Sequence, residues 1–169
     1  MLKPVKSLAC ALSLLVCFGA PMAIKPAQAQ RIEPAHNLAA DARAAAQQGK
    51  PLLLFVTQPG CSFCERARRE YLRHLAVDPA YTKRLLLREL SIEGNVTGFD
   101  GKRSTGLAAA RALNVKLYPT IVIVDGVGQV IAAPLAGFTV PDFYAAQIDG
   151  RIEEAEAQLA ARIKPGSTN

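Results

Sequence analysis

Two cysteines separated by two residues stand where an apolar run gives way to a charged stretch, and this pair restricts the fold more than any other feature. The stretch TQPGCSFCER (57–66) contains both Cys61 and Cys64 and directly follows the apolar run PLLLFVT (51–57). A short apolar run bounded by turn residues is typical of a strand buried on both faces. The sequence therefore predicts a central strand whose end carries the cysteine pair to the start of a helix.

The two cysteines differ in their expected surroundings. Cys61 falls at the first turn of the predicted helix, where unpaired backbone N–H groups and the helix dipole lower the pKa of a thiol. Cys64 follows three residues later on the same helix face, close enough to form a disulfide with Cys61. It shares an apolar stripe with Ala67 and Tyr71, so we expect it to be buried. Cys61 is then the attacking thiol and Cys64 the resolving thiol.

The pair also allows two other interpretations, a metal site and a structural crosslink. A zinc site needs two more nitrogen or sulfur ligands, and only His36 and His74 could supply them, so no metal and no cofactor is expected. His74 lies ten residues beyond Cys64, about 15 Å along a helix, too far to act as a base for either thiol. A purely structural disulfide would close a loop of only four residues and stabilise little, yet it remains an alternative.

The first 29 residues are typical of a secretory signal peptide. Two lysines precede an apolar stretch from Leu8 to Ala20, and Ala27-Gln28-Ala29 supplies small residues for cleavage. The apolar stretch is shorter than the ~20 residues of a spanning helix. Lipidation at Cys17 is a minor alternative, because a lipoprotein box requires a small residue directly before the cysteine and Val16 stands there. We therefore expect a periplasmic protein whose only remaining cysteines are the pair, in a compartment where disulfides persist.

Charge and length limit the remaining possibilities. The net charge of +6 falls to +3 without the three lysines of the leader, which leaves 17 basic and 14 acidic residues. This small excess of positive charge does not indicate nucleic-acid binding. The arginines between Arg66 and Arg73 alternate with Glu65 and Glu70 at helical spacings, so a solvated, salt-bridged face is expected, with a docking surface for an acidic partner as the alternative. We expect one domain over residues 30–163, followed by a disordered tail at 164–169.

The remaining pattern predicts alternating helices and strands. Ser104 or Thr105 is expected to cap a helix, and Asp78-Pro79 to end the helix that starts at the cysteines. The closing helix is expected from Pro141, with Phe143, Ile148 and Ile152 in phase and an interruption at Gly150. The predicted elements, in order, are a helix at 38–48, a strand at 51–57, the cysteine helix, a strand at 85–92, a loop at 93–105, a helix at 106–113, a hairpin with strands at 118–125 and 129–135, and the closing helix.

Two stretches together resemble the thioredoxin superfamily. They are LLLFVTQPGCSFCERARREYL and YPTIVIVDGVGQVIAAPLAGF, and the resemblance spans roughly residues 37–160. It is strongest with the bacterial periplasmic branch that includes SoxW-like proteins. The resemblance implies an α/β thioredoxin-like fold, a central mixed sheet flanked by helices. It also implies a redox-active Cys61–Cys64 disulfide.

The resemblance gives the Tyr118-Pro119-Thr120 stretch a role that local rules would not. Pro119 stands where the family has a cis-proline beside the disulfide, although only about 5–6% of X-Pro bonds are cis in folded proteins. Tyr118, Pro119 and Thr120 are therefore expected to bind substrate, with the Tyr118 backbone facing the bound chain. The sequence departs from the family in three places. Phe55 stands where a buried acid often lies, Gly60 stands where a tryptophan often precedes the first cysteine, and Ser62-Phe63 replaces the Gly-Pro of thioredoxin. Glu65 is a candidate substitute for the acid, although a solvent-facing position is expected for it.

These expectations describe a monomeric thiol–disulfide oxidoreductase that reduces protein disulfides. A membrane thiol donor is the expected partner, because an oxidising compartment would drain electrons from the dithiol. The dipeptide Ser62-Phe63 between the cysteines does not fix the direction of exchange. The alternatives are a disulfide oxidase or isomerase, and a non-catalytic binding module with a structural disulfide. Two features argue against an oxidase or isomerase. The ~20 residues expected before the first strand are too few for an isomerase's dimerisation domain. The stretch between Cys64 and Pro119 is too short for a DsbA-like helical insertion.

Overall fold

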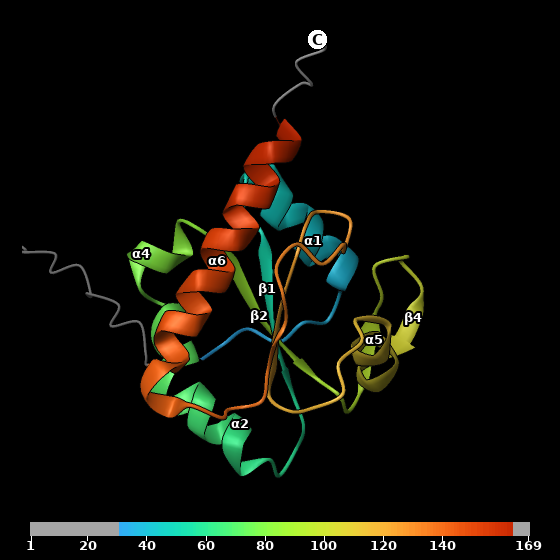
Figure 1. Ribbon diagram of the computed structural model, residues 1–169. Coiled ribbons are helices and arrows are strands. Elements are labelled where there is room, and N and C mark those ends of the chain that lie inside the picture. Colours follow the sequence, from blue (N-terminus) through green and yellow to red (C-terminus); the bar gives the residue numbers. More distant parts are fainter. Residues whose placement is uncertain (1–30, 164–169) are drawn as a thin grey trace, which may run out of the picture.

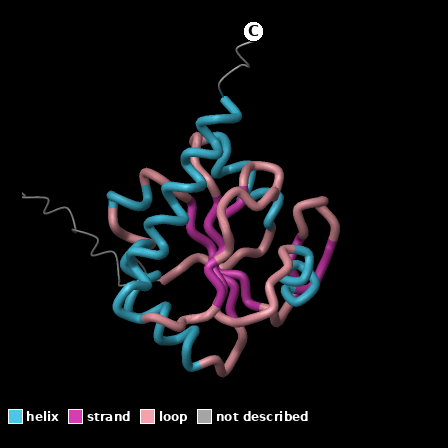
Figure 2. The backbone as a smooth tube through the Cα atoms, in the orientation of Figure 1, coloured by secondary structure: helices cyan, strands magenta, loops and turns pink. Residues whose placement is uncertain are grey.

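The computed structural model describes residues 31–163 of the chain (Figure 1). The predicted signal peptide at 1–29 and the predicted tail at 164–169 lie outside these residues. Helices lie on both sides of a central sheet (Figure 2), which is the α/β arrangement expected from the sequence. In the described part of the chain, no helix combines the length and the apolar character needed to cross a membrane.

A mixed four-stranded sheet forms the centre of the fold. Its strand order is β2-β1-β5-β6, with bounds of Leu86–Ser91, Leu52–Thr57, Thr120–Val124 and Leu135–Ala136 respectively. β1 pairs with β2 in parallel and with β5 antiparallel, and all six residues of β1 are buried. The unbroken apolar run of β1 thus reflects a central position, since such a strand is covered on both faces.

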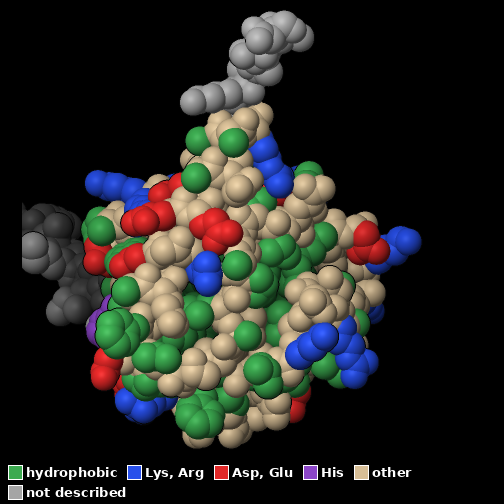
Figure 3. Space-filling model, viewed as in Figure 1, with side chains coloured by type: hydrophobic (Ala, Val, Ile, Leu, Met, Phe, Trp, Pro, Cys, Tyr) green, Lys and Arg blue, Asp and Glu red, His purple; other side chains and the backbone are tan. Residues whose placement is uncertain are grey.

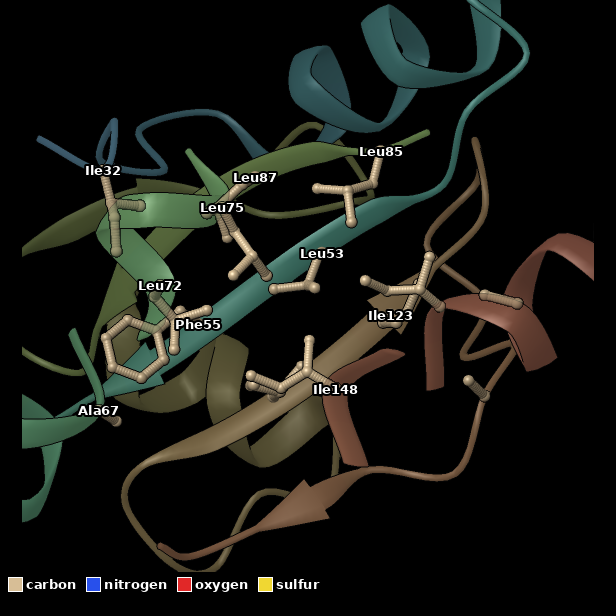
Figure 4. Packing of buried hydrophobic residues seen from close by; sticks show 14 of the residues in the cluster. Ile32, Leu53, Phe55, Ala67, Leu72, Leu75, Leu85, Leu87, Ile123 and Ile148 are labelled. Carbon is tan, nitrogen blue, oxygen red and sulfur yellow. The ribbon is translucent and has the colours of Figure 1, made fainter. Parts of the chain in front are cut away.

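Alternate side chains of β1 belong to two separate hydrophobic clusters, one on each face of the sheet. Leu53 and Phe55 point toward the helices that follow the cysteines and toward α6 (Pro141–Ile163), which crosses this face in Figure 1. Figure 4 shows the two side chains directed at Leu72 and Ile148. Residues 52, 54 and 56 pack on the other face against α1 (Leu38–Gln47) and α5 (Gly106–Ala112). The period-2 geometry of a strand therefore divides the core into two layers.

The cysteine helix is composed of three segments rather than one regular helix. α2 (Ser62–Ala67) continues into a π-helical turn, η2 (Arg68–Leu72), and then into α3 (Arg73–Leu75). A π turn adds a residue to the repeat, so Leu72 becomes fully buried where regular spacing predicts Tyr71. Tyr71 is only partly buried, and its hydroxyl donates a hydrogen bond of 2.7 Å to the Pro141 carbonyl. Tyr71 therefore packs against the same hydrophobic cluster as Cys64 and Ala67, as predicted, but Leu72 takes the fully buried position.

The end of this helix also differs from the prediction. α3 ends at Leu75, three residues before Asp78. Asp78 instead caps the next helix, α4 (Pro79–Thr82), by accepting a hydrogen bond of 2.8 Å from the Ala80 N–H. Proline at the first helical position suits such a start, because its missing N–H would be unpaired there. Asp78-Pro79 thus marks the beginning of a helix rather than the end of one.

The predicted loop at 93–105 contains a small β-hairpin. β3 (Asn95–Thr97) pairs antiparallel with β4 (Arg103–Thr105) as a separate two-stranded sheet. Each strand has only three residues and mostly polar side chains, which leaves no hydrophobic period for sequence reasoning to detect. Thr105 then caps α5, accepting a hydrogen bond of 3.1 Å from the Ala108 N–H, as one of the two predicted caps.

The second strand of the predicted hairpin is largely irregular. Residues 129–135 were expected to form it, yet β6 comprises only Leu135–Ala136, and Val130 makes an isolated bridge with Val124. Pro134 has no N–H to donate to a ladder. The preceding Ala133 N–H donates to a Glu154 carboxylate oxygen at 3.2 Å instead of to β5. Proline and a side-chain acceptor on α6 together explain the interruption.

The closing helix continues through Gly150, contrary to the predicted interruption. α6 has 23 residues, and the residues two positions on either side of Gly150, Ile148 and Ile152, are both buried. Their burial outweighs the roughly 1 kcal/mol by which glycine disfavours a helix. Phe143, expected in the apolar phase, is 63% exposed, and Tyr144 takes the core position.

Candidate active site

Cys61 lies at the start of α2, as the sequence predicts. It is the N-cap residue, with an extended backbone, and its Sγ accepts a hydrogen bond of 3.1 Å from the Cys64 N–H. The chain turns into this position through Gly60, whose φ of +71° is a conformation that glycine adopts readily. A sulfur that receives a helix N–H is favoured in its anionic form once the pair is reduced.

The two cysteines are bonded to each other and differ in exposure. They form a disulfide with a Cα–Cα distance of 5.2 Å, within the usual range for such bonds. Cys64 is 0% exposed, whereas Cys61 is partly exposed. An incoming sulfur therefore has access to Cys61 and not to Cys64.

The Tyr118-Pro119-Thr120 stretch lies beside the disulfide. The Tyr118–Pro119 peptide bond is cis, and the Tyr118 carbonyl oxygen is 3.8 Å from Cys61 Sγ. This is a contact rather than a hydrogen bond, because a sulfur in a disulfide carries no proton. The Thr120 hydroxyl donates to the Leu117 carbonyl at 2.7 Å and holds the turn. Pro119 and Thr120 are buried, so Tyr118 is the residue of the three that borders the exposed sulfur.

Exposed apolar side chains are concentrated around this region. Phe63, between the cysteines, is 57% exposed, and Leu117 is 60% exposed. Val140 and Phe143 lie at the start of α6, which the Tyr71–Pro141 hydrogen bond ties to the cysteine helix. Hydrophobic side chains gather over the lower part of the molecule in Figure 3, where α2 and the start of α6 lie. Such a cluster offers an apolar contact surface beside the disulfide.

Phe55 occupies the place where the thioredoxin resemblance predicts a buried acid. It is fully buried, and the nearest acid in the sheet register is Glu89, its partner on β2. Glu89 accepts hydrogen bonds from the Thr57 hydroxyl at 2.8 Å and from Arg68 Nε at 3.1 Å. Sequence reasoning missed Glu89, because only the parallel register of β1 and β2 brings it beside Phe55.

Arg68 connects this acid to the cysteine helix. Its guanidinium bonds both Glu89 and Glu65 and lies 5.7 Å from the centre of the Phe55 ring. Burial lowers the pKa of Arg68, but hydrogen bonds and charges from Glu89 and Glu65 outweigh burial and raise it above its ordinary value. The Glu65 side chain is 66% exposed, in agreement with its expected solvent-facing position. A fixed cation, rather than an acid, therefore lies one helical turn beyond Cys64.

Other charged groups do not extend the site. Across residues 31–163, no group of three or more histidine, cysteine, aspartate or glutamate side chains is placed to hold a metal ion. Part of the predicted salt-bridged face is present, with Arg66 bonded to Glu70 at 3.0 Å and Arg68 paired as described above. His74 is exposed on α3.

The fold and the disulfide agree with the comparisons to known proteins. The family model described as a thioredoxin-like domain matches residues 38–150, which is more than half of the chain. The chain belongs to the thioredoxin-like domain family. No curated protein matches it.

Solved structures of thioredoxins resemble this thioredoxin-like protein. A chain from the complex of ferredoxin:thioredoxin reductase with thioredoxin f2 is 16% identical, with 72% of this chain and 96% of that chain covered and a TM-score of 0.51. Trxlp from Edwardsiella tarda is 26% identical, with 72% and 98% covered and a TM-score of 0.47. The periplasmic thioredoxin SoxS from Paracoccus pantotrophus is 19% identical, with 63% and 99% covered and a TM-score of 0.45. The first of these supports the thioredoxin fold, which together with the Cys61–Cys64 disulfide suits thiol–disulfide redox chemistry.

Proposed function

We propose that this protein is a periplasmic thiol–disulfide oxidoreductase, of the SoxW-like branch, that reduces disulfides in protein substrates. The observation that carries the proposal is the asymmetry of the pair. Cys61 is partly exposed at a helix start beside the Tyr118 carbonyl, and Cys64 is fully buried beneath it. This asymmetry suits one sulfur that meets substrate and a second that acts only afterwards.

The reaction proceeds in two exchanges from the reduced form. The Cys61 thiolate attacks one sulfur of a substrate disulfide, forming a mixed disulfide and releasing the other substrate sulfur as a thiolate. Cys64 then loses its proton and attacks Cys61 Sγ, which breaks the mixed disulfide and releases the second substrate thiolate. The substrate gains two electrons and the protein becomes the Cys61–Cys64 disulfide. A membrane thiol donor must return two electrons to restore the dithiol.

The surroundings of the sulfurs support a protein substrate. The Tyr118 carbonyl beside Cys61 is a backbone acceptor for an extended substrate chain, and Phe63 and Leu117 supply apolar contact area. Between Cys64 and Pro119 the described elements are short, with four residues in α4 and seven in α5, and the stretch holds no inserted helical domain of the oxidase type. The protein is proposed to act as a monomer, without nucleic acid or cofactor.

A trapping experiment tests the function. In Cys64→Ser the mixed disulfide at Cys61 forms but cannot be resolved, so partners from a periplasmic extract should remain covalently bound and be released by reductant. Cys61→Ser is the matched control and should trap none. Equal trapping by the two variants, or none by either, would favour the non-catalytic module.

The direction of exchange needs a separate measurement. A reductase should be mostly reduced in cells and have a reduction potential well below the ~−120 mV of a strong oxidant. A protein found mostly oxidised, with a potential near that value, would be an oxidase.

A further inference from the structure

A groove separate from the disulfide lies at the edge of the sheet. Its volume is about 900 Å³, at the upper end of the range for small-molecule sites. One wall is the segment 31–36, the second is the cysteine helix from Glu65 to Arg73, and the floor runs from the end of β2 into β3. Neither Cys61 nor Cys64 lines it.

The wall at 31–36 is held in place by the sheet. The Ala35 N–H donates to the Glu89 carbonyl, and the Glu89 N–H donates to the Glu33 carbonyl, both at 2.8 Å. These bonds extend the sheet beyond β2 in parallel fashion, with Pro34 opposite Glu89. At the far end, α5 begins against β2 so closely that Gly106 has no room for a side chain. The groove is therefore bounded by hydrogen-bonded backbone on two sides.

Four arginines and three glutamates, Glu65, Glu89 and Glu93, line the groove, so arginine is in excess once Arg68 has paired with two of the glutamates. Arg68 is bonded by Glu65 and Glu89. Arg69 has a single contact of 3.5 Å with Glu70, and Arg31 and Arg73 have no ion pair among residues 31–163.

Arg73 gives the clearest sign of a missing partner. Its Nε atom is buried, yet it has no hydrogen-bond partner within the described part of the chain. Buried donors are nearly always paired in folded proteins. Arg73 also lines the groove, so an acceptor from outside the chain would meet its guanidinium there through the terminal nitrogens.

The arginine side chains of the groove walls indicate which chemical groups a ligand would need. Guanidinium groups present planar N–H pairs that fit carboxylate and phosphate oxygens in two-point contacts. Two of the incompletely paired arginines lie on the cysteine helix and the third on the opposite wall, so they are placed to hold more than one oxyanion. The floor between them includes the buried apolar side chains Leu90 and Val96. An organic body with two or more oxyanion groups matches this combination.

We propose that the groove binds a small organic polyanion through Arg31, Arg69 and Arg73. The oxyanion groups are carboxylates or phosphates, which the arginines accept alike. A small ligand fits better than an acidic protein surface, because the unpaired arginines converge on a concavity. On the face seen in Figure 3, acidic and basic side chains are interspersed rather than gathered into one basic patch.

Binding of two probes tests the proposal. Citrate represents the carboxylate arm and inorganic pyrophosphate the phosphate arm, and sodium chloride at matched ionic strength is the blank. Titration calorimetry on the purified protein should show saturable binding of at least one probe, with a dissociation constant below about 1 mM. Preference for one probe identifies the oxyanion chemistry.

Matched variants locate the binding. Arg73→Met and Arg69→Met should each weaken binding about tenfold or more, because each removes a charge-assisted pair. Arg43→Met is the control, since Arg43 is exposed on α1 outside the groove, and it should stay within about twofold of the parent protein. The thermal unfolding midpoint of each variant verifies that it is folded.

Two outcomes would overturn the proposal. One is the absence of saturable binding of either probe beyond the chloride blank. The other is binding that folded Arg73→Met and Arg69→Met retain at the parent level, or that Arg43→Met weakens equally. Neither depends on thiol chemistry, so the result stands apart from the test of the redox function.

Discussion

Gly106 has a neighbour so close that replacing it with alanine should destabilise the protein. A Cβ atom at this position would lie 1.9 Å from the Ser91 carbonyl oxygen and 3.0 Å from two backbone atoms of Ile92. Real Cβ atoms essentially never approach closer than 3.0 Å, so the start of α5 must move away by about 1.1 Å, the difference between 3.0 and 1.9 Å. The neighbour cannot easily move instead, because the Ile92 N–H is bonded to the Thr57 carbonyl at 2.9 Å.

The expected cost follows from packing energetics. Overpacking costs typically about 1–3 kcal/mol, and a clash with fixed backbone belongs at the upper end. Alanine favours a helix over glycine by up to about 1 kcal/mol, which offsets part of the clash. Gly106→Ala should therefore lower the free energy of unfolding by about 2 kcal/mol, which lowers the unfolding midpoint by roughly 8 °C in a domain of this size.

Gly150→Ala is the matched control for the same chemical change. Gly150 lies within α6 and is exposed, and no neighbouring atom lies within 4 Å of the position that a Cβ would take, so alanine meets no obstacle there. This variant should raise the free energy of unfolding by about 0.5–1 kcal/mol. Urea unfolding followed by circular dichroism measures both. A Gly106→Ala protein within about 0.5 kcal/mol of the parent, which is the scatter of neutral surface changes, would refute the packing argument.

Two carboxylates yield further predictions. Glu89→Gln should destabilise the protein by about 1–3 kcal/mol, because it leaves the partly buried Arg68 with only the exposed Glu65 as counter-charge. Glu65→Gln, at a side chain 66% exposed, should cost under about 0.5 kcal/mol, and equal costs of the two variants in urea unfolding would contradict this. A hydrogen bond from Arg84 lowers the pKa of Glu156, so this carboxylate stabilises the fold above its unfolded pKa of about 4.3 and loses that effect as the pH falls through the lower folded value. Glu156→Gln should thus cost up to about 1 kcal/mol at pH 7 and progressively less as the pH falls below about 4.3, and a cost that is constant with pH would count against the ion pair.

Sequence patterns predicted the structure correctly where burial or a helix cap determines the local conformation. The continuous apolar run 51–57 predicted β1, and β1 lies at the sheet centre as Leu52–Thr57. Thr105 was one of two predicted caps and does cap α5. The burial of Cys64 also followed from helical spacing, since the first turns of α2 are regular.

The sequence-based predictions differ from the structure where tertiary contacts override local patterns. Leu72, which was not predicted, takes a fully buried position beside Tyr71 because a π turn shifts the register between Ala67 and Leu72, and no local residue signals that turn. Gly150 did not interrupt α6 because the helix buries both flanking turns against the sheet. The strand expected at 129–135 is interrupted by Pro134 and by a hydrogen bond that the Ala133 N–H donates to Glu154 of α6, which is remote in sequence.

Phe55 stands where the family often has a buried acid, and it shares a hydrophobic cluster with the buried Cys64. An acid beneath a thiol can accept its proton, whereas phenylalanine cannot. The Arg68 guanidinium lies over this ring. The Arg68 backbone N–H donates to the Cys64 carbonyl, so the Arg68 side chain begins one helical turn after the Cys64 side chain. The charged group over this ring is therefore a cation, which cannot accept a proton. Since Glu89 and Glu65 both bond Arg68, the same two acids that partly neutralise this cation also fix its position above Phe55. The position therefore holds an apolar ring and a fixed cation where the family often has a buried base.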